Sequence, residues 1–215
     1  MKGYIYITGT GVDPSLRAGF TDPTFRNPPM LGPCMPNIRK AVAVGDWIFI
    51  VSGKIPEARQ YIIGGLQVAE KIHAVEAYKR FPENRLRVDR QGLVMGNIVV
   101  RADGTHDPLD WHSDHRFEQR AMNFIVGGAA VVLSTTAEVE FGRRSTLPIL
   151  AQIKGRPGAS RVIEAMGRMS RLNDGQVKEL LNWFGRIRNA AAEASSGRSD
   201  RARRSPDRRN RRCDG

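Results

Sequence analysis

The sequence predicts an α+β domain with a small, curved, mostly antiparallel sheet, open or closed into a barrel, and helices at its C-terminal end. Two observations predict this class. Segments rich in β-forming residues dominate residues 1–150 without strand–helix–strand alternation, and helical periodicity is concentrated after residue 160. The length of 215 residues suits one domain of ordinary size. We therefore expect a single domain over residues 1–194 and a disordered, arginine-rich tail over residues 195–215.

The N-terminal part is predicted to hold two strands separated by a long loop. Residues 1–7 are rich in β-formers, and residues 44–51 read as a Gly-Asp-Trp turn followed by a buried strand. Between them, prolines at positions 23, 28, 29, 33 and 36 exclude a helix or a central strand from most of the segment. Residues 37–41 allow a short helical turn. Long ordered loops of this kind are usually functional.

The middle of the chain is predicted to consist of short strands and turns. Strands are expected over residues 61–72, 96–100, 123–126 and 130–134, with Gly64-Gly65 bending the first and Gly127-Gly128 separating the last two. A short helix over residues 73–80 should end before Pro82, and residues 102–115 should form a polar loop. Residues 147–152 suit a short strand or a turn.

The C-terminal part is predicted to be helical. Apolar residues recur at three- and four-residue spacing over residues 160–170 and again from about residue 177 to 187. Asn173 or Asp174 can cap the second helix, which should run to about Ala192.

The net charge of +12 is divided between the tail and the body. Residues 198–214 hold eight Arg and three Asp, which gives 8 − 3 = +5 and leaves 12 − 5 = +7 for the rest of the chain. A body with this charge should attract polyanions, unless the charge serves solubility alone. The mobile arginines of the tail suit salt-dependent, sequence-independent contact with phosphates, unless the tail is a non-functional extension.

The remaining composition points to the reducing cytoplasm. The longest apolar runs fall short of the roughly 20 residues that cross a membrane, so no membrane partner is expected. Neither a secretory signal nor a plausible disulfide between Cys34 and Cys213 is evident. No cofactor and no oligomeric state can be read from the residues.

Several short motifs of the first 150 residues resemble a known family. These are Tyr4-Ile5-Tyr6, Asp13, Gly19-Phe20, the segment Cys34-x-Pro36-x-Ile38-Arg39, Val44-Gly45-Asp46-Trp47-Ile48, Tyr61-Ile62-Ile63 and the Tyr78 helix. Together they look like the second type of the nucleotide modification associated domains, with similarity to PUA-like folds such as EVE and ASCH domains. The resemblance implies a role in phage or bacterial systems that modify, or respond to, altered bases. It carries over no catalytic residue.

A PUA-like fold implies a base-binding cleft lined by aromatic side chains and polar groups. Stacking of a base on an aromatic ring contributes about 1–3 kcal/mol, and a flipped base also needs hydrogen-bonding partners. For Tyr6 and Trp47, packing in the core is the competing interpretation; Trp111 lies in a polar loop, where burial is less expected. The candidates are Tyr4, Tyr6, Phe20, Arg39, Trp47, Ser52, Lys54 and Trp111.

Histidines and aspartates are concentrated between residues 104 and 116. Three interpretations stay open for this His/Asp loop: ligation of a divalent ion, metal-free acid–base catalysis with Asp orienting His, or local capping in a solvated turn. The His-x5-His-x2-His spacing matches no standard zinc site, and no metal site is predicted. The candidate catalytic residues are His106, Asp110, His112, Asp114 and His115.

Two further signals are weaker. Arg143 and Arg144 lie beside hydroxyl residues and suit bidentate phosphate contact, or else form a solvated basic turn. Cys34 has no histidine near it in sequence, so a buried or loop thiol is favoured over a nucleophile.

These observations support three classes of function. The first is a nucleic-acid or nucleotide binding protein that recognises a modified base. The second is an enzyme that acts on such a base, by a glycosylase-like or hydrolytic reaction, through the His/Asp loop. The third is a regulatory partner without chemistry of its own.

Overall fold

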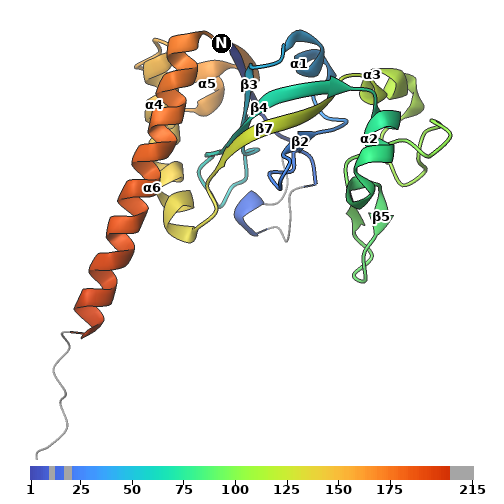
Figure 1. Cartoon of the computed structure of the whole chain (residues 1–215). Helices are drawn as coiled ribbons and strands as arrows, with labels where there is room; N and C mark the ends of the chain where they lie inside the picture. The colour runs from blue at the N-terminus through green and yellow to red at the C-terminus, as the bar shows by residue number, and fades with distance from the viewer. Residues whose placement is uncertain (10–12, 17–20, 204–215) are drawn as a thin grey trace, which may run out of the picture.

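The computed structural model describes residues 1–9, 13–16 and 21–203, with side chains up to residue 195 (Figure 1). The strands are β1 (Gly3–Ile7), β2 (Met30–Leu31), β3 (Trp47–Val51), β4 (Ile62–Ile72), β5 (Arg87–Val88), β6 (Val94–Met95), β7 (Phe124–Val132) and β8 (Met169–Leu172). The α-helices are α1 (Pro36–Ala41), α2 (Ala74–Arg80), α3 (Phe117–Ala121), α4 (Thr136–Ile153), α5 (Val162–Met166) and α6 (Asp174–Arg203). Short 3₁₀ turns are η1 (Pro14–Leu16), η2 (Pro82–Asn84) and η3 (Asp114–Arg116).

Six strands form one mixed sheet in the order β2-β7-β4-β3-β1-β8. Only β1 and β3 run parallel, with Gly3 opposite Trp47 and Ile7 opposite Val51, and the other neighbours are antiparallel. The predicted α+β class, the mostly antiparallel sheet and the C-terminal helices are therefore confirmed. The alternative of a closed barrel is not what the described strands form, because β2 and β8 are the two edges of an open sheet.

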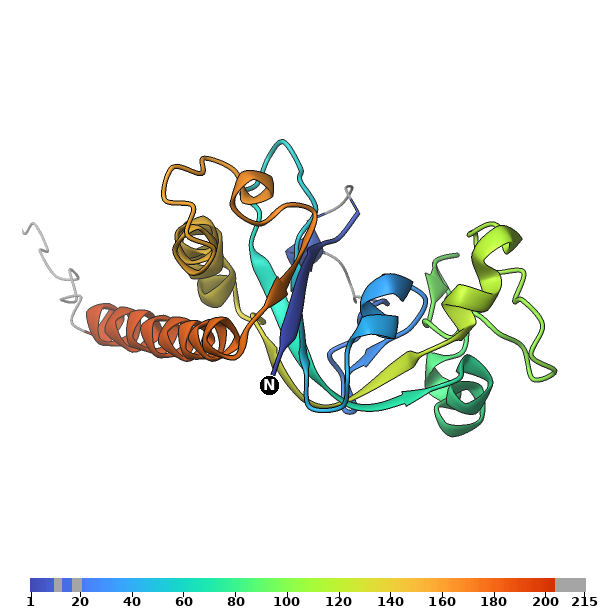
Figure 2. The same cartoon turned by 90° about the horizontal axis from the view of Figure 1, so that it is seen from above.

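Helices α4, α5 and α6 cover one face of the sheet, and α1 with the proline-rich loop (residues 21–36) covers the other (Figure 2). On the helical face, Phe49 stacks between Trp47 at 5.6 Å and Phe184 of α6 at 6.3 Å. Because side chains alternate along a strand, Gly3 of β1 faces Val177 of α6 while Tyr6 faces α1.

A second, smaller core lies at the far ends of β4 and β7 (Figure 1). There, α2, α3 and residues 98–100 pack around Phe124. Helices α4, α5 and α6 contribute to the main core instead. The His/Asp loop is attached at this end of the sheet, so the second core supports the loop where it leaves the folded body. Its buried members are Met30, Ala74, Ala77, Ile98, Val100, Ala121, Phe124 and Val126.

Helix α4 corrects the prediction for residues 136–153. The sequence suggested a basic turn at Arg143-Arg144 and a strand or turn over residues 147–152, but both segments lie inside this helix. Thr135 and Glu138 start it with a reciprocal capping box, and the helix continues through Pro148. The internal proline and Gly142 concealed the helical pattern.

The glycines of the sheet mark close contacts rather than turns. The two strands expected over residues 123–126 and 130–134 are the single strand β7, which continues through Gly127. A Cβ on Gly127 would lie 2.8 Å from Pro29 Cγ, so glycine lets the proline-rich loop approach the sheet. In β4, the register is irregular beside the predicted glycine pair, between Ile62 and Gly64 opposite β3, and again between Gln67 and Glu70 opposite β7.

Three other segments differ from their predicted form. Residues 97–100 are buried, but the segment 96–100 forms only isolated bridges, Arg85 with Ile98 and Val100 with His106. The helix expected over residues 160–170 is the shorter α5 followed by edge strand β8. Helix α6 extends to Arg203, beyond the predicted end near Ala192, and residues 204–215 lie outside the described part of the chain.

The fully buried guanidinium of Arg39, at the C-terminal end of α1, joins the proline-rich loop to α3. Its Nε donates to Cys34 O at 2.9 Å and its Nη2 to Pro33 O at 3.1 Å. On the other side, Nη2 donates to Gln119 O and Arg120 O, and Nη1 donates to Met122 O. The cation therefore satisfies carbonyls at the C-terminal end of α3 that have no partner within the helix.

Asp22 holds the other side of the proline-rich loop. Its carboxylate accepts hydrogen bonds from Gly32 N at 2.6 Å and Cys34 N at 2.8 Å. Burial lowers the pKa of Arg39 to about 10, and the charge of Asp22 opposes this shift. Burial also raises the pKa of Asp22, against the backbone hydrogen bonds that it accepts. Arg39 therefore stays charged at neutral pH.

Replacing Arg39 with methionine should lower the free energy of unfolding by about 3–5 kcal/mol, because five buried or partly buried carbonyl groups would lose their donor. Urea denaturation measures the change. Arg26→Met is the matched control, since Arg26 is exposed and has no ion pair within the described residues. Equal stability of the two variants would contradict this role for Arg39.

Candidate functional site

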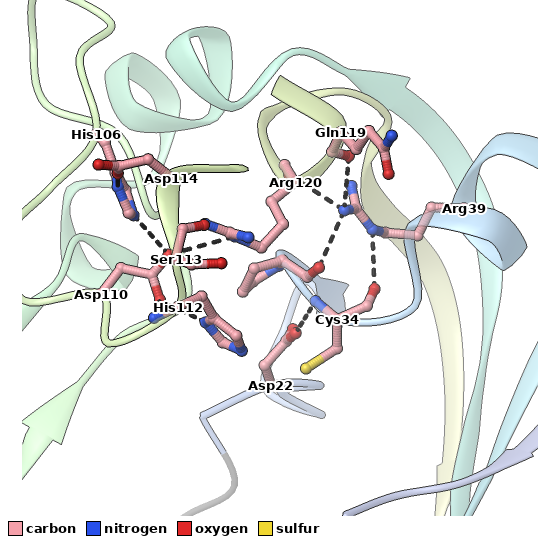
Figure 3. Close-up of polar contacts among 11 residues, drawn as sticks. Asp22, Cys34, Arg39, His106, Asp110, His112, Ser113, Asp114, Gln119 and Arg120 are labelled. Carbon is pink, nitrogen blue, oxygen red and sulfur yellow. Dashed lines mark hydrogen bonds and ion pairs between the residues drawn. The ribbon is translucent and has the colours of Figure 1, made fainter. Parts of the chain in front are cut away.

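The His/Asp loop lies beside the proline-rich loop near the point where Arg39 joins the proline-rich loop to α3 (Figure 3). Asp22 and Cys34 come from one loop, and Asp110 and His112 come from the other. Burial raises the pKa of the Cys34 thiol, and the charges of Asp22 and of Asp110 add to this shift. The thiol is therefore protonated at neutral pH, which fits a structural thiol better than a nucleophile.

Asp110 is the centre of the polar network in the His/Asp loop. Its side chain is 4% exposed, with Oδ1 2.5 Å from His112 Nδ1 and Oδ2 2.8 Å from His106 Nε2. The Nε of Arg120 lies 3.4 Å from Oδ2. Burial alone would raise the pKa of Asp110, but the hydrogen bonds from His112 and His106 outweigh it, and the net shift is downward. Asp110 is therefore a carboxylate anion at neutral pH.

Arg120 connects this network to the Arg39 bridge. Its Nη2 donates to Ser113 O at 2.8 Å, and its own carbonyl accepts from Arg39. Neither Arg120 nor Asp22 belongs to a motif that the sequence predicts to be functional. Asp22 has a partner 75 residues away, at Asn97, and the carbonyl of Arg120 has one 81 residues away, at Arg39, so no local spacing could identify these contacts.

His106 lies between two carboxylates and against an aromatic ring. Its Nε2 contacts Asp110, its Nδ1 contacts Asp114, and its ring centroid is 4.7 Å from that of Phe117. Burial alone would lower the pKa of His106, but the hydrogen bonds to Asp110 and Asp114 outweigh it and the pKa is raised. His106 therefore serves to hold Asp110 in place.

His112 is the histidine that this network presents outward. Asp110 accepts a hydrogen bond from Nδ1, so the neutral ring carries its proton on Nδ1 and a lone pair on Nε2. Nε2 has no hydrogen-bond partner within the described residues. The side chain is 31% exposed, so a ligand can approach it.

Trp111 is the accessible aromatic side chain of the site. It is 85% exposed, and its ring stacks on that of His112 with centroids 4.0 Å apart and planes 24° apart. Asp114 and His115 are also exposed, and His115 has no partner within the described residues. The loop thus combines a free aromatic face with an oriented imidazole.

Four of the predicted binding residues lie in the interior. Tyr6 and Trp47 are 2% and 6% exposed, Arg39 is occupied by carbonyls, and the buried Ser52 hydroxyl accepts from Tyr61 N at 2.9 Å. The structure leaves these side chains no open face for a base. Tyr4 is half-buried against the core. Phe20 lies outside the described residues.

Lys54, Arg143 and Arg144 gather at a different place. They line a cavity of about 1050 Å³ at the end of the molecule formed by α4 and α5. The fold thus places Lys54, which was predicted to line a base-binding cleft, beside the predicted phosphate-contacting pair Arg143-Arg144 and away from the His/Asp loop (Figure 2).

The described residues contain no group of three or more His, Cys, Asp or Glu side chains arranged to hold a metal ion. Within the same residues, every helix is too short or too polar to cross a membrane.

Replacing His106 with glutamine should destabilise the protein more at pH 6 than at pH 9. A raised pKa means that the protonated histidine stabilises the fold below its unfolded pKa of about 6.5, and that this contribution is lost as pH rises through the higher folded value. Asp110 stays ionised over this range because its pKa is lowered. Melting temperatures at both pH values measure the effect.

His115→Gln is the matched control, since His115 is exposed and its loss should be neutral at both pH values. A loss of stability for His106→Gln that is equal at pH 6 and pH 9 would refute the charged His106 bridge.

The comparisons with known proteins agree with the resemblance found in the sequence. No curated protein matches the chain. The family model described as nucleotide modification associated domain 2 matches residues 15–194, which include the proline-rich loop, the His/Asp loop and most of the sheet. This relation connects the chain with nucleotide modification. The chain belongs to the nucleotide modification associated domain 2 family.

Proposed function

We propose that this protein binds a nucleic acid or nucleotide and recognises its base, including a modified base, on Trp111 and His112. The single observation that carries the proposal is the 85% exposure of Trp111 in a loop whose neighbouring imidazole is fixed by Asp110. One face of the indole is covered by His112, which leaves the other for an incoming base.

The energetics of stacking suit this role. A base stacked on an aromatic ring gains about 1–3 kcal/mol whatever its identity. Discrimination between bases needs hydrogen bonds to the base edge, and His112 Nε2 offers an unoccupied acceptor beside the indole. Trp111 would supply affinity, and His112 would supply selectivity.

The charge of the chain supports a polyanionic partner. The body carries +7 after the +5 of residues 198–214 is subtracted from +12. Such a body attracts nucleic acid at low salt without reading its sequence. The family relation supports the context of phage or bacterial DNA modification, including defence, in which an altered base would be the ligand.

Trp111→Ala should weaken binding of single-stranded DNA by roughly 5- to 150-fold, the equivalent of one lost base stack. Trp111→Phe is the control, because it retains an aromatic face. Since Trp47 and Trp183 are buried, iodide quenching of fluorescence reports chiefly on Trp111, and DNA should protect it. The probes are oligonucleotides with cytosine, 5-hydroxymethylcytosine or its glucosylated form.

Two results would count against base recognition at this loop. One is unchanged affinity of Trp111→Ala for every oligonucleotide. The other is the absence of binding by the unaltered protein at low salt.

A second candidate function is an enzyme that acts on the same base, and the Asp110–His112 pair is the observation that favours it. A buried carboxylate 2.5 Å from Nδ1 orients the imidazole and fixes the tautomer in which Nε2 carries the lone pair. The free Nε2 could then remove a proton from a water molecule that attacks the base or its glycosidic bond.

His112→Gln should abolish turnover of a modified oligonucleotide, because an amide cannot act as the base, while the protein stays folded with a melting temperature lowered only by the weakened contact to Asp110. His115→Gln, in the same loop and without a described partner, should retain full activity. Chromatography of the released bases or nucleosides measures turnover. Activity that survives in His112→Gln would exclude His112 as the base.

A further inference from the structure

A second site lies on the helical side of the sheet. Its cavity of about 1050 Å³ is enclosed by the ends of β1 and β3, the loop of residues 52–60, α4, and α5 with the turn after it. Figure 2 places α4 and α5 at one end of the molecule and α3 with the His/Asp loop at the other. The cavity is therefore separate from the Trp111–His112 site.

The walls of this cavity are strongly basic. The lining contains one acidic residue, Glu57, among the described residues. Positive side chains come from four separate segments, so the fold and not a local charge run brings them together. They are Lys54, Arg59, Arg143, Arg144, Arg161 and Arg168.

Most of these cations are not neutralised by the protein. Arg161 pairs with Glu164, and Arg143 pairs with Asp13. Within the described chain, no acidic side chain forms an ion pair with the other four, which are Lys54, Arg59, Arg144 and Arg168. Unpaired cations around a concave space concentrate positive potential there and attract anions.

The position of the cavity in the fold is also typical of a ligand site. Strands β1 and β3 are the parallel pair, and the cavity lies beyond their carboxyl ends, at Ile7 and Lys54. In open, mostly parallel α/β sheets, ligands bind beyond the carboxyl ends of the strands, and the one parallel pair of this sheet offers the same arrangement. Thr8 holds together the two segments that follow β1 and β3 at this edge of the cavity, because its Oγ1 accepts a hydrogen bond from Gly53 N at 2.9 Å.

A second cavity of about 820 Å³ adjoins the first and shares Arg143 with it. Phe25, Tyr61 and Ile63 make part of its wall apolar and aromatic. The guanidinium of Arg143 lies 5.6 Å from the ring centroid of Tyr61 and donates to Ser15 Oγ at 3.0 Å.

Arg143 retains an unused donor at this junction. Its Nε is buried and has no hydrogen-bond partner within the described residues. A buried polar atom without a partner is costly, and a ligand acceptor at the junction would satisfy it.

We propose that the two cavities bind one mononucleotide, with its phosphate groups among the four unpaired cations and its nucleoside beside Phe25 and Tyr61. Planar guanidinium groups match phosphate oxygens through paired hydrogen bonds. A site with both an apolar part and a cationic part suits a nucleoside phosphate better than inorganic phosphate or a bare nucleoside. The protein would then hold a free nucleotide independently of the base bound at Trp111.

Isothermal titration at low salt with ATP, AMP, adenosine and pyrophosphate tests this proposal. ATP should bind most tightly and adenosine most weakly. Arg144→Gln combined with Arg168→Gln should reduce ATP affinity by roughly tenfold or more, because charge-assisted hydrogen bonds are lost. The matched control is Arg90→Gln combined with Arg188→Gln, which removes the same charge from exposed positions without described ion pairs and should bind ATP as before.

The remaining outcomes separate this site from the one at Trp111. Trp111→Ala should bind ATP normally, and loss of ATP binding in this variant would overturn the second site. No ATP binding by the unaltered protein, or an equal loss in both double variants, would also overturn it. Pyrophosphate that binds as tightly as ATP would refute the place of the nucleoside beside Phe25 and Tyr61.

Discussion

The buried guanidinium of Arg39 is the interaction on which the candidate site depends. It connects the carbonyls of Pro33 and Cys34 to those of Gln119 and Arg120, which lie about eighty residues further along the chain. This polar connection adds to the apolar contact of α3 with the proline-rich loop in the second core, which contains Ala121 and Met30. The side chain of Arg120, and through it Asp110, takes its position from the same helix. The buried charge of Arg39 thus helps to position the loop that carries the exposed residues Trp111 and His112.

The sequence predicted the strands and the general class because those depend on local pattern. β1, β3 and β4 are continuous apolar or β-rich runs, and their predicted positions agree with the structure. Helix α4 was not predicted, because Gly142 and Pro148 interrupt its helical pattern. Its stability comes from a capping box and from burial against the sheet. Local composition could not reveal burial imposed by distant segments.

The same limit applies to the candidate site. The His/Asp loop was identified because histidine and aspartate are concentrated there, and Trp111 because an indole in a polar loop is unusual. The sequence could not tell that Trp111 is exposed and Trp47 is buried, because the burial of Trp47 depends on its stacking on Phe49 inside the core. Likewise, Arg143 and Arg144 were visible as a pair, whereas Arg59 and Arg168 join them only through the arrangement of the loop after β3 and the turn after α5.

The pairing of β1 with both β3 and β8 has a consequence for how the chain folds. Tyr6 lies opposite Ile50 on one side and opposite Met169 on the other, so one neighbour is close in sequence and the other is more than a hundred and fifty residues away. During synthesis the first strand can acquire its parallel partner early, but its other edge stays open until the last strand leaves the ribosome. Contacts of such long range slow folding. For much of translation the N-terminal strand is therefore an exposed edge, open to chaperones or to wrong partners.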